Sequence, residues 1–193
     1  MAQANILIDK LDAFIRKYYR NQVIRGLLIT LSVAGLGFIV VAGIESLGQF
    51  GVGGRTVLFW VFVLASGGTF LRGVLWPCLQ WAQLAGGLSH DDAGKIVGDH
   101  FPEIADRLLN TLQLQRDAKK SASNGSKELL LASIDQRTET LRPIPFVAAI
   151  NLKENARYLK YAMPPLVVLL IVGLWKPSWV TEPTERLISH RQE

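Results

Sequence analysis

Two long apolar runs dominate the hydrophobic pattern of this chain. The first run, Gly26 to Ile44, has nineteen consecutive residues without a charge, and the second, Thr56 to Leu71, follows a glycine-rich stretch. At about 1.5 Å per helical residue, nineteen residues cover about 30 Å, which is the thickness of the hydrocarbon core of a bilayer. The second run reaches that length if its helix continues to Trp81. The pattern predicts a transmembrane helical hairpin over residues 23–81.

A third apolar run, Tyr161 to Trp175, lies near the end of the chain. It contains Pro164 and Pro165, which would start or kink an intramembrane helix rather than extend it. We predict a third transmembrane helix over residues 151–180, with a re-entrant or interfacial segment as the alternative. If the helix crosses, residues 181–193 are the start of an extracytoplasmic segment, and their pattern is that of an element cut off midway.

The polar N-terminal segment has an apolar stripe at helical spacing. Leu7, Leu11, Phe14 and Tyr18 recur on one face, and charged residues occupy the other faces. We predict an amphipathic interfacial helix over residues 1–22, which lies at the inner surface of the membrane and contacts anionic headgroups. The alternative is that this segment is the solvated start of the first membrane helix.

The segment 82–150 carries most of the acidic residues of the chain and is expected to face water. Three amphipathic helices fit its pattern: Ser89 caps the first, Pro102 opens the second, and Ser126 caps a third that stops before Pro143. Their apolar faces are the candidates for binding one another and a protein partner. The residues on these faces are Ile104, Leu108, Leu112, Leu130, Ile134 and Leu141.

The charge distribution predicts an orientation. The formal net charge is +5, and five Lys or Arg residues precede the first apolar run, whereas the loop between the first two runs holds only Arg55. Cytoplasmic flanks of membrane helices carry such an excess. The N-terminus and segment 82–150 are therefore expected in the cytoplasm, and the C-terminus outside, in a bacterial inner membrane. Lys119 and Lys120 have no interleaved aromatic residues, so we expect no nucleic-acid partner.

The predicted fold class follows from these segments. It is an all-α integral membrane protein, with a transmembrane helical hairpin, a cytoplasmic three-helix insertion and a third transmembrane helix. The chain is therefore expected to cross the membrane three times.

Small residues recur at every fourth position on both helices of the hairpin. Such spacing lets helix backbones approach closely in lipid. The two stripes can face each other within one chain or form the interface of a homo-oligomer. Their residues are Gly26, Thr30 and Ala34 on the first helix and Ala65, Thr69 and Gly73 on the second. Arg72 is the one charge inside the second helix; it is a candidate functional site, although it lies near the inner end and can snorkel to the headgroups.

No combination of residues indicates a reaction. His90, Asp91, Asp92 and His100 form the main cluster of ligand-type residues, but the first three fit the N-terminal turn of a helix. Cys78 is the single cysteine, so no intrachain disulfide is expected. We expect no catalytic, metal-binding or cofactor-binding residues.

Four segments of the chain resemble a known family. They are residues 10–19 (KLDAFIRKYY), 55–60 (RTVLFW), 100–114 (HFPEIADRLLNTLQL) and 129–136 (LLLASIDQ). With these segments the chain resembles the N-terminal membrane region of large, functionally uncharacterised envelope proteins of Bacteroidetes-type bacteria. In that family a long extracytoplasmic region follows the membrane segments, which implies that this chain is a fragment of a longer one. The resemblance implies no catalytic residue.

The function that these patterns favour is a non-enzymatic inner-membrane anchor and protein-interaction module of a cell-envelope protein. Two alternatives remain. A transporter or channel subunit would need polar residues within the helices, such as Thr30, Ser66 and Arg72. A membrane enzyme acting on envelope precursors would use the cluster that contains His90 and His100.

Overall fold

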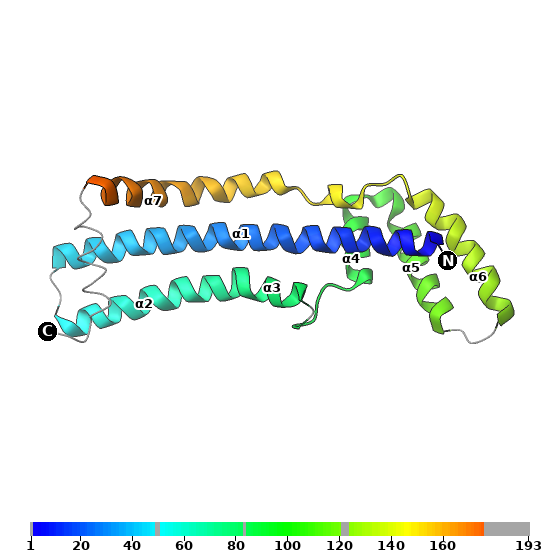
Figure 1. Cartoon of the computed structure of the whole chain (residues 1–193), viewed down its shortest axis with the longest axis horizontal. Coiled ribbons are helices and arrows are strands. Elements are labelled where there is room, and N and C mark those ends of the chain that lie inside the picture. Colours follow the sequence, from blue (N-terminus) through cyan, green and yellow to red (C-terminus); the bar gives the residue numbers. More distant parts are fainter. Residues whose placement is uncertain (1, 49–50, 83, 121–123, 176–193) are drawn as a thin grey trace. The chain divides into compact units, whose positions relative to one another are not determined.

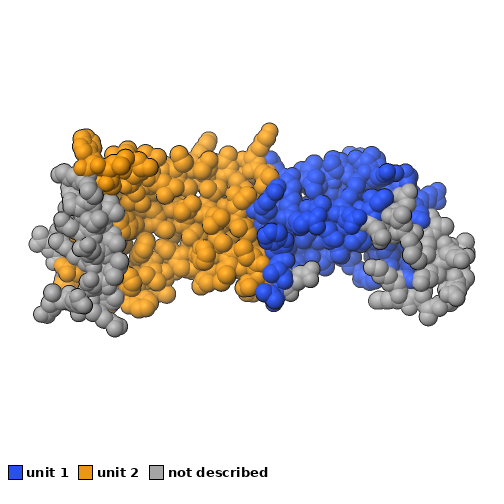
Figure 2. Space-filling view, in the orientation of Figure 1, with its two compact units in different colours: residues 1–20, 80–151 blue, residues 21–79, 152–193 orange. Residues whose placement is uncertain are grey.

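Helices make up almost all of the structure, a computed structural model that describes residues 2–48, 51–82, 84–120 and 124–175 (Figure 1). No strand occurs in these ranges, which confirms the all-α part of the predicted fold class. The chain divides into two compact units (Figure 2). Unit 1 consists of Met1–Arg20 and Gln80–Asn151, and unit 2 consists of Asn21–Leu79 and Leu152–Glu193.

Unit 2 contains the three apolar runs. Its helices are the greater part of α1 (Ala2–Gly48), then α2 (Val52–Phe70), and α7 (Asn155–Trp175) after the short turn η4 (Leu152–Glu154). A π-helical turn, η1 (Leu71–Leu75), joins α2 to α3 (Trp76–Trp81). In the described part of the chain, three helices are long and apolar enough to cross a membrane, over Ile6–Glu45, Val52–Trp81 and Phe146–Trp175. These helices coincide with the three predicted apolar segments.

In unit 2, α1 packs against both α2 and α7 (Figure 1). Gly26 of α1 touches Gly73, and Gly37, eleven residues later, meets Phe62, which lies eleven residues before Gly73. The hairpin is therefore antiparallel and in constant register. The α7 helix runs in the same direction as α1, because three contacts advance together along both helices. They join Asn21 to Asn155, Arg25 to Tyr158 and Gly35 to Pro165.

Pro164 and Pro165 lie inside α7 rather than at its start. A Cβ added at Gly35 would lie 3.0 Å from the Cβ of Pro165, so the ring of Pro165 packs directly against α1 where α1 has no side chain. The helix begins at Asn155 and not at Asn151. The prolines therefore belong to the packed face of this helix.

Unit 1 is built from the first twenty residues and three further helices. These are α4 (His90–His100), α5 (Ala105–Lys120), which follows the turn η2 (Pro102–Ile104), and α6 (Asn124–Leu141); the turn η3 (Phe146–Ala149) follows. The three helices and the proline-terminated end of α6 agree with the prediction, although α6 begins at Asn124 and not after Ser126. The buried core residues are Leu7, Leu11, Phe14, Ala93, Val97, Ile104, Leu108, Leu112, Leu141, Phe146 and Ile150.

The N-terminal segment differs from the expected interfacial helix over residues 1–22. Its apolar stripe is confirmed, but Leu7, Leu11 and Phe14 are at most 1% exposed because they pack into the core of unit 1. The Lys10 Nζ also donates hydrogen bonds to backbone carbonyls at the end of α6, including that of Leu141 at 3.4 Å. The segment is continuous with the first long helix, as the alternative had it, but protein and not solvent covers its apolar face.

Candidate functional site

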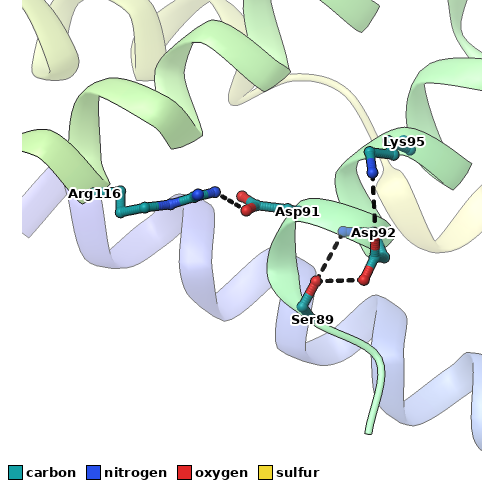
Figure 3. A network of polar contacts seen from close by, with 5 residues as sticks. All are labelled: Ser89, Asp91, Asp92, Lys95 and Arg116. Carbon is teal, nitrogen blue, oxygen red and sulfur yellow. Dashed lines mark hydrogen bonds and ion pairs between the residues drawn. The ribbon is translucent and has the colours of Figure 1, made fainter.

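The N-terminus of α4 has the largest polar network that the sequence had singled out (Figure 3). Ser89 caps the helix as predicted: its Oγ accepts a hydrogen bond from the Asp92 backbone N–H at 3.1 Å and donates one to Asp92 Oδ2 at 2.6 Å. The Lys95 Nζ donates to Asp92 Oδ1 at 3.3 Å. The hydrogen bond from Ser89, followed by that from Lys95, lowers the pKa of Asp92. These contacts stabilise the start of a helix.

A hydrogen bond and an ion pair tie α4 to its neighbours in unit 1. The His90 Nε2 lies 2.8 Å from Asp12 Oδ1 on α1, and Asp91 pairs with Arg116 on α5 (Figure 3). A pocket of about 240 Å³ lies beside these pairs, with Ile8 and Leu112 as its apolar lining. All four side chains of the two pairs are partly exposed, so each pair adds little to stability. The two contacts hold the start of α4 against α1 and α5.

The candidate residues His90, Asp91, Asp92 and His100 do not converge on one point in the structure. His90 and His100 are the first and last residues of α4, about 15 Å apart along a helix of this length. The Ser89 hydroxyl is bonded to Asp92 and makes no contact with His90 that would activate it as a nucleophile. In the ranges that the structure describes, no three His, Cys, Asp or Glu side chains are grouped to hold a metal ion.

The predicted interaction residues lie in the interior of unit 1. Five of them are 7% exposed or less: Ile104, Leu108, Leu112, Ile134 and Leu141. The side chain of Leu130 lies outside the described residues. Four of the five belong to one core cluster, so they pack against each other as expected. Their burial keeps these five side chains out of reach of a partner while unit 1 is folded.

The predicted small-residue stripes meet within the hairpin, most closely at Gly26 and Gly73. The constant register places Thr30 level with Thr69 and Ala34 level with Ala65. The two threonine hydroxyls donate to backbone carbonyls of their own helices, Thr30 to Gly26 at 2.8 Å and Thr69 to Ala65 at 3.0 Å. Ala65 is exposed, and so is Arg72. The close approach is thus confined mainly to the glycines.

Sequence reasoning missed an ion pair at the other end of the hairpin. Glu45 is 1% exposed, and its Oε1 accepts a hydrogen bond from Arg55 Nε at 2.9 Å. Arg55 belongs to the first turn of α2 and not to the loop. The sequence did contain a sign of this ion pair. Glu45 is the only acid between Asp12 and Asp91, and Arg55 is the only basic residue between the two apolar runs.

The fold and these contacts define a class: a protein of two compact units whose described residues are helical, with three helices among them able by length and composition to span a membrane. No protein-family model, curated protein or solved structure matches this chain.

Proposed function

We propose that this chain is a non-enzymatic anchor and interaction module of a bacterial cell-envelope protein, in which unit 2 crosses the inner membrane three times and unit 1 stays in the cytoplasm. The main support is the exposed apolar surface of unit 2. Large apolar side chains are exposed on all three helices, among them Leu36 on α1, Leu64 on α2 and Leu170 on α7 at 51, 68 and 62%. Contiguous exposure on this scale is typical of a surface that lipid covers.

The length of the uncharged part of α1 matches the thickness of the hydrocarbon core of a bilayer. Arg25 precedes the uncharged stretch of α1, and Glu45 follows it, with the Glu45–Arg55 pair at that end. Glu45 is twenty positions after Arg25, which is about 30 Å of helix. This is the thickness of a hydrocarbon core, so the charged groups would lie at the two interfaces.

The connectivity supports one threading. The chain passes between the two units three times. Asn155, near one passage, donates a hydrogen bond to Asn21, near another, at 2.7 Å, and Gly73, near the third, touches Gly26. All three passages are therefore at one end of unit 2. Both segments of unit 1 then lie on the same side of the membrane, and the basic residues at that end favour the cytoplasmic side.

Accessibility of single cysteines tests this threading. In a Cys78→Ser background, Asn110→Cys on the exposed face of α5 and Gly51→Cys before α2 provide one thiol on each side. We expect a membrane-impermeant thiol reagent to label Gly51→Cys in intact spheroplasts, and Asn110→Cys only after permeabilisation. Labelling of both from one side would contradict the threading, and release of the chain by alkaline carbonate would contradict the anchor itself.

The interaction role is supported by the outer face of α5. Asp106, Asn110 and Gln113 are exposed there, while the apolar face of the same helix is closed within the core. We expect a photoreactive amino acid at Asn110 to give one protein adduct of defined mass in native membranes. The same amino acid at Leu64, which is 68% exposed on α2, should give lipid adducts only. Lipid-sized adducts alone at both positions would leave the anchor without an interaction role.

A further inference from the structure

Unit 2 presents cationic side chains from two neighbouring segments of its hairpin at one level. Gly26 of α1 and Gly73 of η1 touch each other. Arg25 immediately precedes Gly26 in the sequence, and Arg72 immediately precedes Gly73. Both arginines are exposed. The contact of the two glycine backbones therefore brings two positive charges to the same height of the bundle.

The third helix adds two further cations at this height. The guanidinium carbon of Arg25 lies over the ring of Tyr158 on α7, 4.7 Å from its centroid. Arg157 precedes this tyrosine and Lys160 follows it by two residues, and both are exposed. We call Arg25, Arg72, Arg157 and Lys160 the cationic belt of unit 2.

Acidic residues are fewer than cations at the level of the cationic belt in the part of the chain that the structure describes. Unit 2 has two described acids, Glu45 and Glu154. Glu45 pairs with Arg55 at the opposite end of α1, and Glu154, one turn before Arg157, is one carboxylate against the four cations of the belt. The belt therefore carries an excess of positive charge that attracts anions.

Aromatic side chains accompany the belt. Trp76 lies one helical turn after Arg72 and is 51% exposed, and Tyr161 lies one turn after Arg157 and is 61% exposed. Exposed Trp and Tyr side chains prefer the headgroup level of a bilayer, where the ring is in an apolar and the polar edge in a wet environment. A soluble anion would need no such flanking rings.

We propose that the cationic belt binds the phosphate groups of anionic phospholipids in the cytoplasmic leaflet, an inference that rests on the proposed membrane anchor. The ring of Tyr158 restrains the Arg25 side chain by a cation–π contact. The guanidinium group can then donate two parallel hydrogen bonds to a phosphate. Arg72, Arg157 and Lys160 supply further positive charge around the bundle.

Lipid selectivity of the inserted full chain tests the belt. Spin-labelled phosphatidylglycerol and phosphatidylcholine are compared in vesicles that contain the wild type, and we expect a preference of roughly tenfold for phosphatidylglycerol that falls as salt increases. Arg25→Gln with Arg72→Gln should lose most of this preference. Arg107→Gln with Arg137→Gln removes the same charge from exposed positions of unit 1 and should keep it.

The outcomes separate the two proposals. An inserted double variant at Arg25 and Arg72 that keeps the full preference would overturn the lipid site and leave the anchor intact. Release of the wild type by alkaline carbonate would overturn both. An inserted wild type that binds inorganic phosphate but shows no preference for phosphatidylglycerol would show that the belt takes a free anion and would contradict lipid binding.

Discussion

At Gly26 the absence of a Cβ decides how closely two helices approach. A Cβ built at this position would overlap the carbonyl group of Gly73, and one built at Gly73 would lie 3.1 Å from the Gly26 Cα. The contact is between backbones, so no rotation of a side chain can relieve an added methyl group. Helices in lipid are held together mainly by such packing.

We therefore expect Gly26→Ala to weaken the hairpin by about 1–3 kcal/mol, as overpacking commonly does. Gly43→Ala is the matched control on the same helix, since a Cβ there meets nothing within 4 Å. Thermal unfolding in detergent, followed by circular dichroism, compares the two variants. Equal midpoints for Gly26→Ala and Gly43→Ala would show that the glycine contact does not hold the hairpin.

Of the individual contacts in the hairpin, the sequence predicted one and not another. The spacing of Gly26 and Gly73 predicted that these positions pack, because small residues at helical spacing suffice for that inference. The spacing could not predict that Glu45 is buried and bound to Arg55, because both residues stand at the ends of the apolar runs. Burial of a carboxylate depends on which side chains surround it in three dimensions.

At the scale of elements, the apolar stripes identified the helices but not their partners. Leu7, Leu11 and Phe14 have the period of an amphipathic helix, and such a stripe shows only that one face is covered. A membrane surface and a protein core require the same stripe. In the structure the stripe packs into a protein core, since Leu11 and Phe14 are fully buried among residues of α4, α5 and the segment after α6.

The faces of α5 and α6 illustrate the same ambiguity. Leu108, Leu112 and Ile134 were candidates both for mutual packing and for a protein partner, and their burial shows that they pack within unit 1. The cap of α4 was easier to predict, because Ser89 and Asp92 form their contacts within one turn. Local interactions can be inferred from sequence spacing, whereas contacts between distant segments require the fold.

At the scale of the whole molecule, unit 1 is assembled from two separate segments. Its core combines Leu7, Leu11 and Phe14 with residues of the segment 80–151, and the Tyr19 hydroxyl accepts a hydrogen bond from the Leu88 N–H at 2.7 Å. The core therefore needs the start of α1. Two discontinuous segments that pack together in this way are expected to fold as one cooperative unit.

The two segments of unit 1 also end close together, which permits a direct test. A Cβ on Gly87 would lie 2.8 Å from the Gln80 carbonyl oxygen and 3.7 Å from the Tyr19 hydroxyl, so the points where the chain leaves and re-enters unit 1 are neighbours. A short glycine–serine linker can therefore replace residues 21–79. We expect this variant, ended at Asn151, to be monomeric in water without detergent and to unfold cooperatively in urea.

Leu11→Ala in this shortened chain tests whether the N-terminal stripe is part of the core. Leu11 is fully buried, so its truncation should cost about 2–5 kcal/mol, which is a large part of the stability of a small domain. Arg16→Ala, on an exposed position of the same helix, should change little. If α4 and α5 kept their amide hydrogen-exchange protection in Leu11→Ala, the N-terminal helix would not be needed for the core of unit 1. That result would favour the interfacial helix predicted from the sequence.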